Sequence, residues 1–162
     1  MLILIEHPIP PLFDENAKIL ILGSFPSVKS RECGFYYGHP QNRFWKVTAS
    51  VFGEEVPRTE EEKRSMILRN NVALWDVIAS CDITGSSDSS IKNVVPNDVK
   101  RVINSSNVQK IYVNGKKAKS LYDKYLEKEL GITAVCLPST SPANASWSLD
   151  RLQNEWKRLL SI

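Results

Sequence analysis

The stretch that decides the fold is KILILGSF, residues 18–25. Its four consecutive aliphatic residues show no polar alternation, which is typical of a strand covered on both faces, and such strands belong to parallel sheets. The Gly-Ser pair that follows predicts a loop at the carboxyl end of this strand. Ligands of open parallel sheets bind in the crevice outside these ends. We therefore expect the functional residues of the chain to begin directly after this strand.

Strands and helices alternate through the rest of the chain. The predicted strands are VALWDVI from Val72, Val108–Val113 and Thr133–Leu137. The first predicted helix begins at Asn42 or Arg43 and stops at Gly53, and the second runs from a Thr59-x-x-Glu62 capping box through Arg69. A third, capped by Asn97 or Asp98, covers Val99–Ile103. The last two cover Ala118–Leu130 and Leu149–Leu160. The opening MLILIEHPIPP predicts a short strand or a docking arm, and the Ser-rich residues 83–93 predict a loop.

This order of elements predicts a three-layer α/β/α sandwich with a central, mostly parallel sheet of about four strands. The chain has 162 residues, of which 42% are hydrophobic. That length supports one well-buried core and is short for two ordinary domains. We expect a single domain over residues 1–162.

Composition excludes several classes of protein. The formal net charge is only +3, so no global positive field indicates a nucleic-acid binder. The three cysteines are far apart and match no CxxC or zinc spacing, which favours a reduced, cytoplasmic setting with no disulfide framework and no metal. The apolar start lacks a basic region and is too short for a signal peptide or a membrane span. We expect no membrane partner and, by default, a monomer.

Three motifs of other enzyme classes are incomplete. NGKKAKS, residues 114–120, lacks the first glycine of a P-loop and has no Ser or Thr after its first lysine. GSFPS, residues 23–27, is not the G-x-S-x-G elbow of a hydrolase. Cys33 with His39 is a bare pair with no third group to support a nucleophilic dyad. The first two predict no chemistry, and Cys33 with His39 stays open as a minor alternative, because a bare pair seldom forms a dyad.

The loop GFYYGHPQNRFWKV, residues 34–47, places aromatic rings and hydrogen-bonding groups at the start of a helix. Tyr37 offers a flat face, and His39 and Asn42 offer donors and acceptors. Stacking combined with edge hydrogen bonds is how a pocket reads a nucleobase swung out of a duplex. The same residues also fit a structural explanation, in which the rings pack in the core, His39 fixes the turn and Asn42 caps the helix.

A second polar loop, PSTSPANAS, follows the last predicted strand. Its small hydroxyls and amides, from Ser139, Thr140, Ser141 and Asn144, precede another helix. Such groups suit a phosphate backbone, although they equally suit a helix cap. Taken together, the two loops predict a base pocket beside a phosphate-binding loop.

These motifs resemble the uracil-DNA glycosylase superfamily. GSFPS, YYGHPQNRFW and LPSTSPANA are similar to its motifs, and HP-x-NRFWKV is very similar to the mismatch-specific enzymes. Adding ALWDV and SSIKNVVPND, the chain looks closest to the hypoxanthine-DNA glycosylase branch. The resemblance runs from about residue 19 to the last helix. It implies an α/β/α fold and a monofunctional, cofactor-free enzyme of DNA repair that flips out a deaminated base and hydrolyses its N-glycosidic bond.

The resemblance also implies roles for individual residues. The mismatch-specific enzymes orient water with an Asn where this chain has Phe25, so the resemblance transfers that role, or a contact with the base, to Asn42. Tyr37 matches the ring that stacks on the flipped base. Ser139, Ser141 and Asn144 match the motif that holds the flipped backbone in the minor groove, and Ala143 stands where relatives carry a bulkier wedge.

Three hypotheses follow. The first is a glycosylase acting on hypoxanthine, with uracil as the alternative substrate. We expect Phe25 to contact the base together with Tyr37 and His39, and the space between Phe25 and Tyr37 to discriminate the two bases. The second is a non-catalytic lesion-binding protein of the same fold, motivated by Phe25. The third is a hydrolase of free nucleosides. Asp76 and Asp88 are further acids, and we expect Asp76 to make a structural hydrogen bond and Asp88 to be solvated in the Ser-rich loop.

Overall fold

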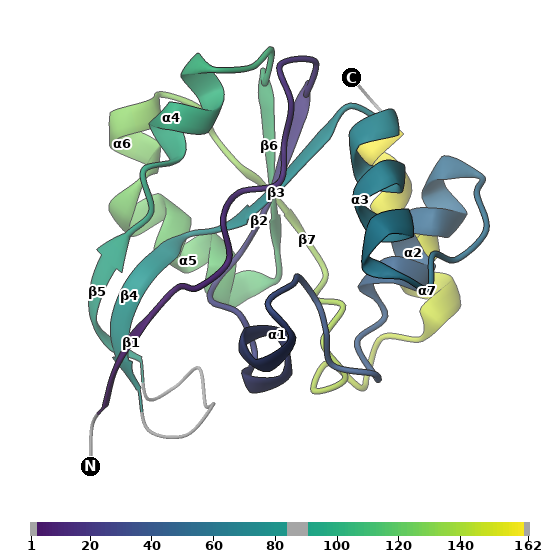
Figure 1. Ribbon diagram of the computed structural model, residues 1–162, viewed down its shortest axis with the longest axis horizontal. Coiled ribbons are helices and arrows are strands. Elements are labelled where there is room, and N and C mark those ends of the chain that lie inside the picture. The colour runs from purple at the N-terminus through teal and green to yellow at the C-terminus, as the bar shows by residue number, and fades with distance from the viewer. Residues whose placement is uncertain (1–2, 84–90, 161–162) are drawn as a thin grey trace.

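The computed structural model describes residues 3–83 and 91–160 (Figure 1). Its strands are β1 (Ile3–Glu6), β2 (Ile19–Gly23), β3 (Val72–Asp76), β4 (Ile78–Ile83), β5 (Lys92–Pro96), β6 (Lys110–Asn114) and β7 (Val135–Leu137). Its helices are α1 (Val28–Cys33), α2 (Phe44–Phe52), α3 (Glu60–Arg69), α4 (Val99–Asn104), α5 (Lys116–Tyr125), α6 (Glu127–Leu130) and α7 (Leu149–Trp156), with a 3₁₀ turn over Lys157–Leu160.

The central sheet has four parallel strands in the order β3-β2-β6-β7, which confirms the predicted fold. β2 and β3 are buried at every residue, as the unbroken apolar runs indicate. The register pairs Gly23 with Asp76 and Asn114 with Leu137. Because the strands are parallel, the four carboxyl ends therefore meet at one edge of the sheet.

Helices cover both faces of this sheet. In Figure 1 the sheet is seen nearly edge-on, with α4, α5 and α6 on one side and α2, α3 and α7 on the other. α2 has buried residues along most of its length and ends at Gly53 in the left-handed conformation, as predicted. Thr59 caps α3 by accepting from the Glu62 N–H. These layers leave the carboxyl edge of the sheet to the loops.

A second, antiparallel sheet in the order β1-β4-β5 was not predicted. VALWDVI is two elements rather than one strand, because β3 ends at Asp76 and the Val77 N–H turns to bond Gly23 O. β4 then leaves for the other sheet. The predicted loop 83–93 is wrong at its ends, where Ile83 closes β4 and Lys92 opens β5; residues 84–90 lie outside the described part, Asp88 among them. β5 is largely exposed, so it lacks the apolar pattern that predicts a strand.

Two further expectations need correction. The predicted helix over Ala118–Leu130 is divided at Leu126 into α5 and the single turn α6. The segment after β2 contains the short helix α1, capped by Ser27 and ended by Gly34 at a φ of 73°. The sequences of α1 (VKSREC) and α6 (EKEL) are short and mostly polar, so neither has an apolar stripe that predicts a separate helix. The N-terminal segment does form the predicted short strand, β1, on the edge of the small sheet.

The packing of α7 against α2 depends on Trp156. This side chain is fully buried, its ring meets Phe44 edge-on at 5.8 Å, and its Nε1–H donates to Pro138 O at 2.9 Å. One residue thus fixes the last helix to α2 and to the loop after β7. The C-terminal helix is therefore part of the core that supports this loop.

We expect Trp156→Ala to lower the free energy of unfolding by about 3–5 kcal/mol, because it leaves a cavity and an unpaired Pro138 carbonyl. Leu160→Ala is the matched control, since Leu160 is 60% exposed and should change stability by less than about 0.5 kcal/mol. Urea titration followed by circular dichroism measures both. Equal effects in the two variants would contradict this role for Trp156.

Candidate active site

A pocket with a volume of about 990 Å³ opens at the carboxyl edge of the parallel sheet. The last residue of each central strand lines it: Gly23, Asp76, Asn114 and Leu137. The loop after β2 and the loop after β7 supply the rest of the wall. This is the position that the strand order predicts for a ligand site.

Asn42 is held by a network of side chains. Its Oδ1 accepts from the Phe44 N–H at 2.9 Å and from the Thr140 hydroxyl at 2.8 Å. The Thr140 oxygen in turn accepts from Asn114 Nδ2 at 3.0 Å, and the Thr140 N–H donates to Asn114 Oδ1 at 3.0 Å. Since the Asn42 oxygen is engaged twice and no described residue accepts from its Nδ2, the amide presents its N–H groups to the pocket.

Arg43 fixes the second loop against the first. Its guanidinium donates to the carbonyls of Trp147, Ser141 and Asn144, and its backbone N–H donates to Thr140 O. Sequence inspection gave no role to Arg43. The sequence signal that could have identified Arg43 is its position directly after Asn42, but only Asn42 was considered as a site residue.

Tyr37 lies beneath the pocket with its ring stacked on Phe44, at a centroid distance of 3.9 Å and an interplanar angle of 14°. Its φ of 51° is uncommon for a residue with a side chain and directs the ring inward. Its hydroxyl is buried, and no described residue forms a hydrogen bond to it. Burial raises the pKa of Tyr37 and the Asp76 carboxylate adds to the rise, against a smaller opposing effect of Asn114. The hydroxyl therefore remains a donor.

Asp76 makes the structural hydrogen bond that the sequence led us to expect, and it also lines the pocket. Its Oδ2 lies 2.7 Å from His7 Nε2, and both side chains are almost fully buried. The Ile9 N–H donates to His7 Nδ1 at 3.1 Å. Sequence inspection missed His7, which comes from the N-terminal segment and has no motif around it.

Phe25, at the position where mismatch-specific relatives have Asn, forms a partly buried apolar section of the wall. Its ring meets His7 edge-on at 5.9 Å, and the Arg31 guanidinium lies 5.4 Å from its centre. Arg31 also lines the pocket, and its Nη1 is buried without a described partner. A phenyl ring has no group to bind water here.

Of the other predicted site residues, most line the pocket and His39 does not. Ser139, Ser141, Ala143 and Asn144 line the pocket, with Ala143 exposed. Thr140 lines it too, but its side chain has 0% exposure, so the expected DNA contact through its hydroxyl is wrong, and that group holds Asn42 instead. His39 lies outside the lining, and its Nδ1 accepts from the Gln41 N–H at 3.1 Å, which fits the turn-fixing explanation.

The cysteines take no part in a nucleophilic pair. The Cys33 thiol donates to the carbonyls of Ser30 and Phe35. Cys136 lines the pocket, but burial raises the pKa of its thiol, which keeps it protonated. In residues 3–83 and 91–160 there is no group of three or more His, Cys, Asp or Glu side chains that could hold a metal ion.

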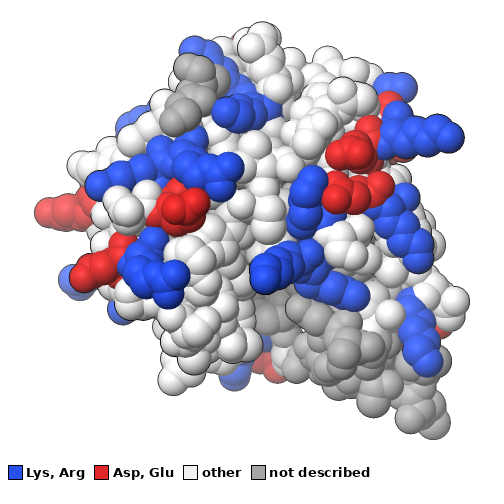
Figure 2. Space-filling model, turned by 180° about the vertical axis from the view of Figure 1, so that it is seen from behind, with Lys and Arg blue, Asp and Glu red and all other residues white. Residues whose placement is uncertain are grey.

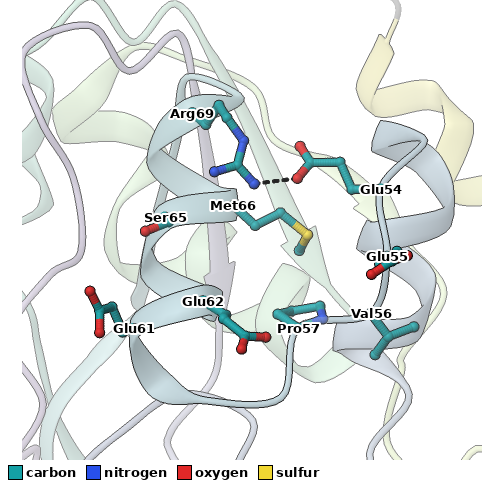
Figure 3. Close-up of a pocket in the computed structure, with 9 residues that line it drawn as sticks. All are labelled: Glu54, Glu55, Val56, Pro57, Glu61, Glu62, Ser65, Met66 and Arg69. Atoms are coloured by element: carbon teal, nitrogen blue, oxygen red, sulfur yellow. Dashed lines mark hydrogen bonds and ion pairs between the residues drawn. The ribbon is translucent and has the colours of Figure 1, made fainter.

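A smaller hollow of about 340 Å³ lies between α3 and the segment before it (Figure 3). Four glutamates, Glu54, Glu55, Glu61 and Glu62, line it with a single cation, Arg69, which pairs with Glu54. This negative balance does not suit an anionic ligand. The hollow is therefore a poor candidate for the site that contacts nucleic acid.

Positive charge occurs at the rim of the large pocket and over other parts of the surface. Lys116 and Lys117, exposed at the start of α5, line the pocket together with Arg31. Figure 2 shows Lys and Arg interspersed with Asp and Glu over the face opposite to Figure 1. Within the described part of the chain, no helix is long and apolar enough to cross a membrane.

Arg43→Met should loosen the second loop, because methionine keeps much of the packing volume and removes all the guanidinium donors. We expect the unfolding free energy to fall by about 2–3 kcal/mol and the amides of residues 139–147 to exchange hydrogen faster. Lys46→Met is the matched control, because Lys46 is an exposed residue of α2, the helix that Arg43 precedes. Hydrogen exchange followed by mass spectrometry measures the effect, and unchanged protection of the loop would refute it.

Comparison with known proteins identifies the family. The model of the uracil DNA glycosylase superfamily matches residues 10–160. Two proteins named hypoxanthine DNA glycosylase are each 36% identical to this chain: that of Methanosarcina acetivorans over 95% of this chain and 97% of the relative, and that of Methanosarcina barkeri over 91% and 92%.

A solved structure supports the same assignment. The solution NMR structure of a Methanosarcina acetivorans protein, whose name carries the words uracil DNA glycosylase, superimposes with a TM-score of 0.82 at 34% identity. The match covers 97% of this chain and 96% of that one. With the family model, the relatives and the fold in agreement, this chain belongs to the uracil DNA glycosylase superfamily.

Proposed function

We propose that this protein is a monofunctional DNA glycosylase that excises hypoxanthine, the deamination product of adenine. The observation that carries the proposal is the Asn42 amide, whose oxygen is engaged by Phe44 and Thr140 so that its N–H groups face the pocket. The names of the two relatives point to the same substrate. The pocket is wide enough to admit a purine.

The reaction needs a hydrogen-bond donor to the leaving nucleobase more than it needs a general base. When water attacks C1′ of the deoxyribose, the bond to the base breaks and its electron pair leaves with the base. Fixed N–H donors stabilise that developing negative charge, while an amide cannot remove a proton at neutral pH. Of the two roles that the resemblance implies for Asn42, contact with the departing base fits this orientation better than activation of water.

The rim of the pocket supports DNA as the substrate rather than a free nucleoside. Lys116 and Lys117 stand at the N-terminus of α5, and the second loop presents Ser139 and Ser141 nearby. Cations and hydroxyls in this arrangement suit the phosphates on either side of a flipped nucleotide. Ala143 is small and exposed, so it adds little as a wedge in the vacated stack.

Asn42→Ala should reduce the single-turnover rate of hypoxanthine release by at least about 100-fold, since one preorganised donor is removed. DNA affinity should change little, because it depends mainly on phosphate contacts. The assay is alkaline cleavage of an end-labelled duplex carrying one deoxyinosine, with a deoxyuridine duplex in parallel. Asn107→Ala, an exposed asparagine away from the pocket, is the control.

The same assay separates the alternatives. Release of uracil in place of hypoxanthine would reassign the substrate within the superfamily. Binding of both lesions by the native chain without release of either base would identify a lesion-binding protein, and turnover of free inosine with weak DNA binding would identify a nucleoside hydrolase.

Thr140→Val should lower the release rate about 10- to 100-fold, because it removes the hydroxyl that orients Asn42 and keeps the shape of the side chain. Thr48→Val is the matched control: Thr48 is also fully buried, but its hydroxyl bonds the Phe44 carbonyl within α2. Rates are compared at saturating enzyme, with DNA affinity measured separately. Equal rate losses in the two variants would show a general effect on stability rather than on Asn42.

A further inference from the structure

One oxygen of the Asp76 carboxylate is hydrogen-bonded to His7, and the other has no hydrogen-bond donor among the described residues. Because the Ile9 N–H donates to His7 Nδ1, that nitrogen is the acceptor of the ring, and Nε2 carries the proton that is donated to Asp76 Oδ2. The other oxygen, Oδ1, receives no hydrogen bond from any residue in the described ranges and belongs to a side chain that lines the pocket. A carboxylate oxygen that lines a pocket and has no donor from the protein can accept a hydrogen bond from a ligand.

A donor without an acceptor lies beside it. A Cβ atom added to Gly23 would lie 2.4 Å from Asp76 Oδ1 and 3.3 Å from the Tyr37 hydroxyl, so the carboxylate occupies the space that Gly23 leaves and the hydroxyl lies close to the same position. The Tyr37 hydroxyl is itself buried without a described partner. The floor of the pocket therefore offers one acceptor and one donor side by side, both unused, in front of a residue with no side chain.

We propose that Asp76, held by His7, is the residue that selects deaminated bases, and that it does so by accepting from the ring N–H that deamination creates. This inference rests on the proposed glycosylase function. Hypoxanthine presents an N1–H donor beside an O6 acceptor, which matches the Asp76 oxygen and the Tyr37 hydroxyl. Adenine presents an N1 acceptor beside an amino donor, the reverse pattern.

A carboxylate suits this task better than an amide. An ionised carboxylate only accepts hydrogen bonds, whereas an Asn amide can rotate and donate to the N1 of adenine. Because Oδ2 is bonded to His7, the carboxylate cannot rotate its Oδ1 away from the pocket without losing that hydrogen bond. Adenine would then set its N1 acceptor against the Asp76 oxygen, an acceptor facing an acceptor, whereas the Tyr37 hydroxyl can turn to accept from the adenine amino group.

Asp76 and Tyr37 recognise the N–H and carbonyl groups of a deaminated base, not the size of its ring. Uracil also carries a ring N–H next to carbonyl groups, so Asp76 and Tyr37 accept its edge as well. Discrimination between hypoxanthine and uracil is then left to the shape of the wall, including the Phe25 ring. His7 is a positioning residue in this scheme, because it acts only through Asp76.

The test compares two lesions in one duplex context: deoxyinosine, and the deoxynucleoside of unsubstituted purine, which has an N1 acceptor and neither the N–H nor the carbonyl. We expect Asp76→Asn to reduce the inosine-to-purine ratio of release rates about 10- to 100-fold. The Asn oxygen can still accept from His7, so the fold should survive, which a thermal melt checks. Asp98→Asn, at an exposed aspartate directly before α4, is the control.

Tyr37→Phe provides an independent arm, because it deletes only the unpartnered hydroxyl. We expect it to slow release from deoxyinosine about 10-fold and to leave release from the purine lesion unchanged, since that base has no oxygen to accept from Tyr37. A purely structural effect would slow both. This variant decides the question if Asp76→Asn does not fold.

The outcomes separate the two proposals. If the native chain releases no hypoxanthine, the proposed function fails. If the native chain releases hypoxanthine and both variants keep its inosine-to-purine ratio, the glycosylase stands and the role of Asp76 is overturned.

Discussion

The buried hydroxyl of Thr140 joins the parts of the chain that make the pocket. It donates to Asn42 at the start of α2 and accepts from Asn114 at the end of β6. Because its side chain is excluded from water, these hydrogen bonds do not compete with solvent and hold one geometry. Arg43 reinforces the same junction from the other side by donating to three carbonyls of the second loop. Two loops nearly 100 residues apart in sequence thereby act as one wall.

The parallel register supplies the floor of this site. Gly23, Asp76 and Asn114 lie next to one another because β3, β2 and β6 are neighbours that run in the same direction. The absence of a side chain at Gly23 leaves room for the Asp76 carboxylate. His7 reaches this floor from the segment after β1, so the small antiparallel sheet contributes to the pocket through its first strand. A polar group at the end of a buried strand is costly, and the fold supplies partners for the Asn114 amide and for Asp76 Oδ2.

The aromatic loop divides its rings between support and function. Phe35, Tyr36 and Trp45 are buried, and the Tyr36 hydroxyl donates to Pro10 O. Tyr37 is partly exposed and stacks on Phe44, so its ring lies between the core and the pocket. The loop is itself held by Ser30 of α1, whose hydroxyl accepts from the Gly38 N–H. Rigid support of this kind is what a base pocket needs, since loose placement of its groups would weaken discrimination.

The sequence by itself determined the parallel sheet and the position of the pocket at the carboxyl ends of its strands, because apolar runs and loop chemistry are local properties. Only the tertiary structure decided that Thr140 is buried, that His39 lies outside the pocket, and that His7 and Asp76 form a pair 69 residues apart. It also decided the second sheet, whose exposed strand β5 has no apolar pattern to predict it. These features arise from contacts between distant segments, and residue spacing along the chain carries no record of which segments meet.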